Sequence, residues 1–296
     1  MRRDTRPPAV LTSGVYTSTA RAARALGVSV STIKRWVDDG VLPAHRTAGG
    51  HRKLFTQALR QRLLDGSLPD PVRDLHQVRR ALLAGMTRRA GASRCALLDA
   101  YHAGVPIETL ADEVVAPVMR TIGQRWETGR ADVCIEHRGT GQCLEAIYQI
   151  KQAVQARPAL ANRPLAVGGS PEGDPYLLAN LLAEVLLIDA GWDVINLGPN
   201  TPLESFEYAL ATYHPRLLWL SISAPPQPRR QFIRAYAHLY AQAVRSGTAV
   251  AIGGRALTPS LRRDLACTMA GDRLRELKQF AATLSYRSPG EMRRAT

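Results

Sequence analysis

The loop 170–176, with the sequence SPEGDPY, places two carboxylates and a phenol directly after the apolar run 165–169. An apolar run that ends in glycines is typical of a buried parallel strand. The segment 176–191 is apolar on nearly every face and ends at a glycine, which predicts a helix buried between layers. With a second strand at 192–198 these elements form a βαβ unit, whose crossover leaves the loop at the carboxyl edge of the sheet, where open α/β folds bind ligands. The candidate ligand-binding residues of this loop are Glu172, Asp174 and Tyr176.

The region 75–157 shows helical spacing of apolar residues in four segments joined by short loops, which predicts an up-down four-helix bundle. Pro117 lies inside the third helical pattern, so a kink or break near Ala116 is expected. Trp126, Glu136 and His137 lie near helix ends and are expected to face one spot. Taken singly, such a Trp is usually part of a core, and a Glu-His pair usually caps a helix or lies on the surface.

A helix-turn-helix pattern lies near the N-terminus, with helices expected at 20–27 and 31–40. The second helix projects polar and basic side chains outward, as a recognition helix in a major groove does. Two basic strands around a Gly-Gly turn follow at 42–55 and predict a wing that contacts phosphates or a minor groove. The candidate DNA-binding residues are Ser31, Thr32, Lys34, Arg35, Arg46, His51, Arg52 and Lys53.

This segment, with its wing sequence RTAGGHRKL at 46–54, resembles the winged-helix DNA-binding domain of the MerR superfamily. The resemblance implies a double-stranded DNA operator as partner. The alternative is a small helical domain that binds protein, as in excisionase-like adaptors. The basic wing and the net charge of +14 favour DNA.

The order of winged helix, four-helix bundle and Rossmann-like domain resembles the light-sensing, cobalamin-binding MerR regulators of the CarH type. In that family a Trp, followed some ten positions later by Glu-His, caps the upper face of adenosylcobalamin, and Trp126, Glu136 and His137 match this pattern. Ser221 and the pair Gly253-Gly254 resemble two motifs that lie around the nucleotide tail. For the glycines, the alternative role is a tight turn between strand and helix.

The first loop departs from the family pattern in the residues that would hold cobalt. Asp174 stands where the family has the cobalt-ligating His, and Leu177 stands where it has a Gly that leaves room for the nucleotide tail. A second His, just after the capping Trp, is replaced by Glu127. A carboxylate is a harder and poorer ligand for cobalt than an imidazole, so both expected cobalt ligands are missing.

Three hypotheses remain for the ligand. Cobalamin binds without an axial residue from the protein, or the pocket holds another tetrapyrrole, or it is empty and the domain is a dimerisation scaffold. A bilin such as biliverdin is slightly favoured, because its pyrrole nitrogens can donate hydrogen bonds to Asp174 and Glu127. Cys134 or Cys143 could attach a vinyl group, although a buried, inert thiol is the common role for such a residue.

The function predicted from the sequence is a DNA-binding transcription regulator, not an enzyme, that senses light or a tetrapyrrole and changes its oligomeric state, as a dimer or tetramer, on DNA. The contrasting class is a corrinoid carrier enzyme, against which the winged helix and the missing cobalt ligand both argue. Four cysteines without metal-ligand spacing and no apolar run long enough to cross a membrane indicate a cytoplasmic protein without a metal site.

The predicted fold class is multidomain, α plus α/β, with a C-terminal flavodoxin-like or Rossmann-like sheet of five parallel strands. The expected segments are a disordered tail at 1–14, a MerR-type winged helix at 15–67, a linker at 68–74, a four-helix bundle at 75–160, a cobalamin-binding-like Rossmann domain at 161–288 and a tail at 289–296.

Overall fold

The computed structural model describes residues 15–26, 30–38, 41–47, 50–65, 75–87, 92–128, 133–157 and 162–285. The chain divides into two compact units, of which the first takes in Met1–Pro106 and Pro117–Gly139 and the second takes in Ile107–Ala116 and Thr140–Thr296. The expected linker and both expected tails lie outside the described residues. Within the described ranges, no helix is long and apolar enough to span a membrane.

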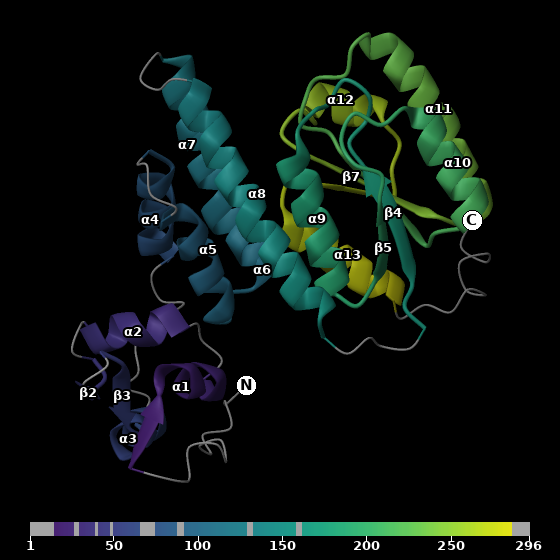
Figure 1. Ribbon diagram of the computed structural model, residues 1–296. Helices are drawn as coiled ribbons and strands as arrows, with labels where there is room; N and C mark the ends of the chain where they lie inside the picture. The colour runs from purple at the N-terminus through teal and green to yellow at the C-terminus, as the bar shows by residue number, and fades with distance from the viewer. Residues whose placement is uncertain are drawn as a thin grey trace. The chain divides into compact units, whose positions relative to one another are not determined.

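The N-terminal part of the first unit is a winged helix (Figure 1). Its antiparallel sheet has the order β1-β3-β2, with β1 at Tyr16–Ser18, β2 at Ala44–Arg46 and β3 at Arg52–Phe55. Its helices are α1 (Thr19–Leu26), α2 (Val30–Asp38) and α3 (Thr56–Leu64). The predicted helix pair and wing are therefore confirmed, whereas β1 has no counterpart in the sequence prediction, because three residues are too few to show an alternating pattern.

The core of the winged helix is made by apolar side chains from its three helices, from β3 and from the loop before β2. Its buried members are Ala22, Ala23, Ile33, Trp36, Leu42, Leu54 and Leu59. Ser18 links the sheet to the first helix, because its Oγ accepts a hydrogen bond from the N–H of Arg21 (3.1 Å) and so caps α1.

The helical region has all four predicted segments. They are α4 (Leu75–Thr87), α5 (Ala92–His102), the composite segment α6–η2–α7 and α8 (Val133–Gln155). In the composite segment, α6 (Ile107–Thr109) leads into a π-helical stretch, η2 (Leu110–Val115), and α7 (Ala116–Glu127) follows. The predicted break near Ala116 is therefore confirmed as a π-helix, in which the N–H of Ala116 donates to the carbonyl of Ala111, five residues earlier.

The second unit contains a parallel five-stranded sheet with the order β5-β4-β6-β7-β8. The strands are β4 (Leu165–Gly169), β5 (Asp193–Asn196), β6 (Leu217–Ser221), β7 (Ala249–Gly253) and β8 (Met269–Gly271). The helices are α9 (Leu177–Asp189), α10 (Leu203–Tyr213), α11 (Arg229–Ser246), α12 (Pro259–Asp264) and α13 (Leu274–Ser285). This is the predicted flavodoxin-like order, with α9 and α13 on one face of the sheet and α10 and α11 on the other (Figure 1).

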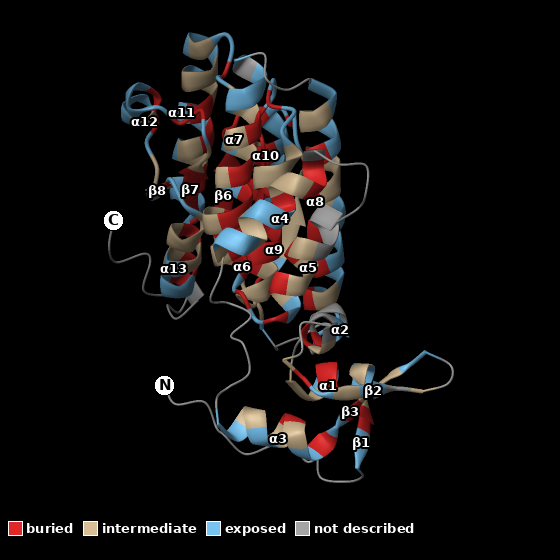
Figure 2. Cartoon of the chain, turned by 90° about the vertical axis from the view of Figure 1, so that its left-hand side faces the viewer, coloured by how far each residue is buried: buried red, intermediate tan, exposed pale blue. Residues whose placement is uncertain are grey.

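Helix α9 is buried along most of its length, as its uniformly apolar sequence predicts. Every residue from Asn180 to Leu187 is buried, and Figure 2 shows the buried residues following the central strands and the helices against them. At the start of α13, the N–H groups of Leu274 and Arg275 donate hydrogen bonds to the carboxylate of Asp112 in η2 (2.8 and 3.1 Å). The π-helical stretch is thereby joined to the start of α13 in the same unit.

Candidate nucleic-acid interface and candidate ligand site

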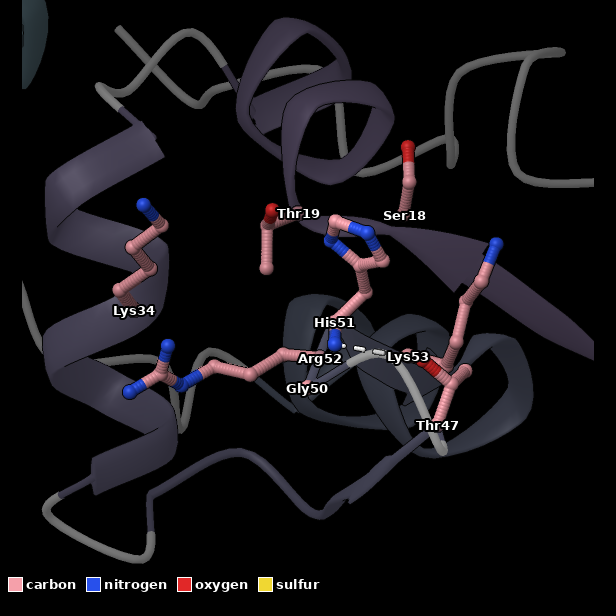
Figure 3. A pocket seen from close by; sticks show the side chains of 8 residues that line it. All are labelled: Ser18, Thr19, Lys34, Thr47, Gly50, His51, Arg52 and Lys53. Atoms are coloured by element: carbon pink, nitrogen blue, oxygen red, sulfur yellow. Dashed lines mark hydrogen bonds between the residues drawn. The ribbon is translucent and has the colours of Figure 1, made fainter.

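A recess of about 310 Å³ on the winged helix collects basic side chains from two elements (Figure 3). Lys34 comes from α2, and His51, Arg52 and Lys53 come from the wing. The other lining residues are Ser18, Thr19, Thr47 and Gly50, so no carboxylate is among the residues that line it. Figure 3 shows the Arg52 side chain extending from the wing toward α2.

The wing is held by its own turn. The N–H of Thr47 donates to the carbonyl of His51 (2.9 Å), and the N–H of His51 donates to Oγ1 of Thr47 (3.2 Å). Gly50 has a φ of +75°, which favours glycine at this point of the turn. This short hairpin fixes the backbone from which the basic residues project, and rigid presentation of cations is what a phosphate-contacting wing requires.

Of the predicted DNA-binding residues, the structure gathers Lys34, His51, Arg52 and Lys53 at the recess. The side chains of Ser31, Thr32, Arg35 and Arg46 lie outside what the structure describes.

At the carboxyl edge of the parallel sheet, Asp174 is buried and its carboxylate is directed into the chain rather than outward. Its Oδ2 accepts hydrogen bonds from the N–H groups of Ser223, at a short distance, and of Ala224 (3.0 Å). Its Oδ1 accepts from the N–H of Tyr176 (3.1 Å). The sequence analysis predicted that this carboxylate binds a ligand. In the structure, three backbone N–H groups donate hydrogen bonds to it.

Glu172 and Tyr176 remain at the surface of the same loop. The guanidinium of Arg255 lies over the Tyr176 ring, 4.6 Å from its centroid, and its Nε donates to the carbonyl of Ser223 (3.0 Å). Cation–π contacts of this kind favour a planar cation over an aromatic face. Arg255 was missed from the sequence, although its position directly after the Gly253-Gly254 pair at a strand end marks it as an edge residue.

The glycines at the end of β7 are required by neighbouring backbone atoms of this chain. A Cβ on Gly254 would lie 2.3 Å from the carbonyl oxygen of Ile222, and its φ of +117° is rare for residues with a side chain. A Cβ on Gly253 would lie 2.9 Å from the carbonyl oxygen of Gly271. Ser221, which pairs with Gly253 in the sheet, is buried. These contacts match the tight-turn alternative, because the space left by each missing side chain holds backbone.

In the helical region, Trp126 is 53% exposed at the end of α7. Glu136 and His137 are neighbours near the start of α8, with Oε2 and Nε2 3.5 Å apart. The side chain of Glu127 lies outside the described residues. These residues belong to the first unit and the loop 170–176 to the second, so a shared site for them stays a prediction.

The two cysteines considered for covalent attachment differ in accessibility. Cys143 is buried, and burial raises the pKa of its thiol to about 12. Cys134 is exposed on the first turns of α8. Since the thiolate is the reactive form, Cys143 is inert at neutral pH.

Comparison with known proteins matches two segments in the N-terminal half of the chain to protein families. Residues 18–53 match the MerR family regulatory protein family, and residues 74–151 match the B12 binding domain. The chain is 28% identical to the HTH-type transcriptional repressor CarH of Myxococcus xanthus, over 69% of this chain and 77% of that protein. The chain therefore carries a segment similar to MerR regulatory proteins, followed by one similar to B12 binding domains.

The fold also has a counterpart among solved structures. The monomethylamine corrinoid protein of Methanosarcina barkeri superposes with a TM-score of 0.55 at 15% identity, over 70% of this chain and 96% of that one. This likeness confirms the predicted helical region and parallel sheet as a fold.

The B12-binding match makes cobalamin the implied cofactor, and the first loop does not fit a cobalt ligand. Asp174 offers a hard oxygen donor, and its carboxylate is already surrounded by backbone N–H groups. Within the described ranges, no group of three or more His, Cys, Asp or Glu side chains could hold a metal ion.

Proposed function

We propose that this MerR regulator binds a double-stranded DNA operator through the recess of its winged helix, and that its role in the cytoplasm is regulatory rather than enzymatic. The observation that carries the proposal is the convergence of Lys34, His51, Arg52 and Lys53 on one recess without a lining carboxylate. Cations placed in this way contact phosphates and fix the register of a protein on DNA, while the outer face of α2 supplies base contacts.

Replacement of Arg52 by Ala tests the interface. The variant should bind operator DNA about tenfold more weakly, and the slope of log affinity against log salt should fall by about 1, because one phosphate contact is lost. Affinity is measured by fluorescence anisotropy at several salt concentrations. Arg234→Ala is the matched control, since Arg234 is exposed on α11 and its loss changes net charge equally. Equal affinities and slopes for the two variants would contradict the assignment.

We propose that the regulator acts as a homo-oligomer, a dimer or tetramer, with one winged helix on each half-site. A single winged helix reads only a few base pairs, and repeated half-sites are the usual solution in helix-turn-helix proteins. A signal that changes the packing of the C-terminal part then changes operator affinity through assembly.

For the signal we propose a tetrapyrrole, sensed directly or through light, with a corrinoid favoured over a bilin. The B12 binding domain match over residues 74–151 supports a corrinoid. The hypothesis of a bilin was based on hydrogen bonds from its pyrrole nitrogens to Asp174 and Glu127, and the carboxylate of Asp174 is engaged by backbone donors. Of the two thiols considered for attachment, Cys143 is buried. Trp126, Glu136 and His137 are the proposed contacts of the helical region, and Glu127 and Cys134 belong to the bilin alternative.

The absorption spectrum of the purified protein tests this choice. Protein from cells supplied with cobalamin should carry the visible bands of a corrinoid, and protein from cells that make biliverdin should carry no red-absorbing band. Trp126→Ala should lower the bound corrinoid several-fold, because a flat ring loses its stacking surface. A red band with biliverdin alone would reverse the preference, and colourless protein from both cultures would exclude tetrapyrrole sensing.

A further inference from the structure

The loop 170–176 is fastened to the neighbouring strand ends by hydrogen bonds from both sides. The carboxylate of Asp174 binds the turn after β6 through the N–H groups of Ser223 and Ala224. Its main chain takes part as well, because its carbonyl accepts from the N–H of Asn200 (2.9 Å). The side chain of Asn200 in turn accepts from the N–H of Gly173 (2.8 Å). The carboxylate of Asp174 thus joins the loop to the end of β6, and the main chain of Gly173 and Asp174 joins it to Asn200 after β5.

Beneath the loop, the space between β4 and α9 is filled by Trp219 of β6. A Cβ on Gly168 would lie 2.0 Å from Cδ2 of the indole, so the ring rests directly on the backbone of β4. Trp219 is buried, and its Nε1 donates to Oδ1 of Asn180 on α9 (3.0 Å). The glycine therefore makes room for a side chain of the protein.

A chain of polar contacts continues from this indole to α8. Asn180 donates to Oδ1 of Asn196 (2.7 Å), and Asn196 donates to Oε2 of Glu184 (2.8 Å). Glu184 also pairs with Lys151, whose Nζ lies 2.5 Å from its Oε1. Buried polar groups that lack partners would indicate a missing ligand, and in the described chain none of the unpartnered buried side-chain atoms belongs to this network or to the loop 170–176.

The surface residues at the carboxyl edge of the sheet also contact one another. The backbone of Gly254 lies against Ile222, and Arg255 covers the ring of Tyr176. Loop, interior and rim are therefore all occupied by atoms of this chain.

We propose that the carboxyl edge of this sheet is closed by the protein itself, with Asp174 as an internal latch. A corrinoid bound by the helical region then receives no cobalt ligand from the first loop and has no space for its nucleotide tail between β4 and α9. The proposal rests on the proposed function only in the choice of corrinoids as probes.

The first test compares a corrinoid that has a nucleotide tail with one that has none. The wild-type protein is titrated with hydroxocobalamin and with diaquacobinamide in the dark, and dissociation constants are measured by absorbance. With the edge closed, the two constants should agree within about threefold, since a tail that gains no contacts adds no affinity. More than about tenfold tighter binding of hydroxocobalamin would overturn the proposal. If neither probe binds, the closed edge is supported and the corrinoid in the proposed function is excluded.

The second test measures the latch without any ligand. Asp174→Asn presents an amide to three N–H donors, and it should lower the unfolding midpoint of the ligand-free protein by about 5 °C, as expected for lost charged hydrogen bonds in a domain of this size. Glu172→Gln is the matched control, because Glu172 is an exposed carboxylate of the same loop and its loss should leave the midpoint within about 1 °C. An unchanged midpoint for Asp174→Asn, together with weaker corrinoid binding, would show that Asp174 serves a ligand and would overturn the proposal.

Discussion

The recess of the winged helix and the carboxyl edge of the sheet both gather polar residues on turns between regular elements, yet they differ in what those residues contact. The recess is lined by Lys34, Arg52 and Lys53 with no carboxylate among the lining residues. At the sheet edge, the carboxylate of Asp174 is met by three N–H groups of its own chain. The type of a residue suggests chemistry in both places, and at the sheet edge the carboxylate is satisfied inside the protein, whereas the recess gathers basic side chains at a surface without a lining carboxylate.

The same contrast divides two glycines that both have positive φ. Gly254 at the sheet edge is confined by the Ile222 carbonyl, whereas Gly50 in the wing has nothing within 4 Å of the position that a Cβ would take. A side chain at position 254 would overlap the backbone and would also strain φ, whereas a side chain at position 50 would only strain φ.

Gly254→Ala should therefore be the most damaging single substitution among those considered. Its cost is about 4 kcal/mol, from an unfavourable φ and a steric overlap that backbone has to relieve. Differential scanning calorimetry should show the unfolding midpoint falling by about 10 °C.

Gly50→Ala is the matched control in the wing. It should cost about 1 kcal/mol, since a left-handed conformation is its only penalty. Equal shifts in the midpoint for the two variants would mean that the sheet edge is looser than its contacts indicate, and the closed-edge proposal would lose a main support.

The sequence predicted the order of elements well because the relevant signals are local. The apolar runs before Gly169 and Gly253 and the continuous apolar face of α9 each depend on a few adjacent residues. The break near Ala116 followed from Pro117, although proline alone does not specify that the irregularity is a π-helix. Strands β1 and β8, three residues each, fell below the length at which a period shows.

The environment of the loop residues could not be predicted in the same way. Asp174 is held by Ser223 and Ala224, about fifty positions later in the chain, and Trp219 reaches Gly168 across the sheet. A motif shows which residue type is present, and only the fold shows whether its hydrogen-bonding capacity is used. The basic recess was easier to predict from the sequence, because His51, Arg52 and Lys53 are consecutive and only Lys34 comes from another element.

The smallest expected effect concerns the two cysteines of α8, which differ in exposure as the surface recess and the buried sheet edge do. With its pKa raised to about 12 by burial, the Cys143 thiol is almost entirely protonated at pH 8, while Cys134 is exposed. Iodoacetamide should therefore modify Cys143 at least about a hundredfold more slowly than Cys134, as peptide mass spectrometry can follow.

The raised pKa of Cys143 also means that the stabilising contribution of the neutral thiol is complete below the ordinary value of 9.0 and is lost as pH rises toward 12. Cys143→Ala should leave corrinoid or bilin content unchanged, and rapid labelling of Cys143 at pH 8 would place an open path to the interior of the helical region, contrary to its burial.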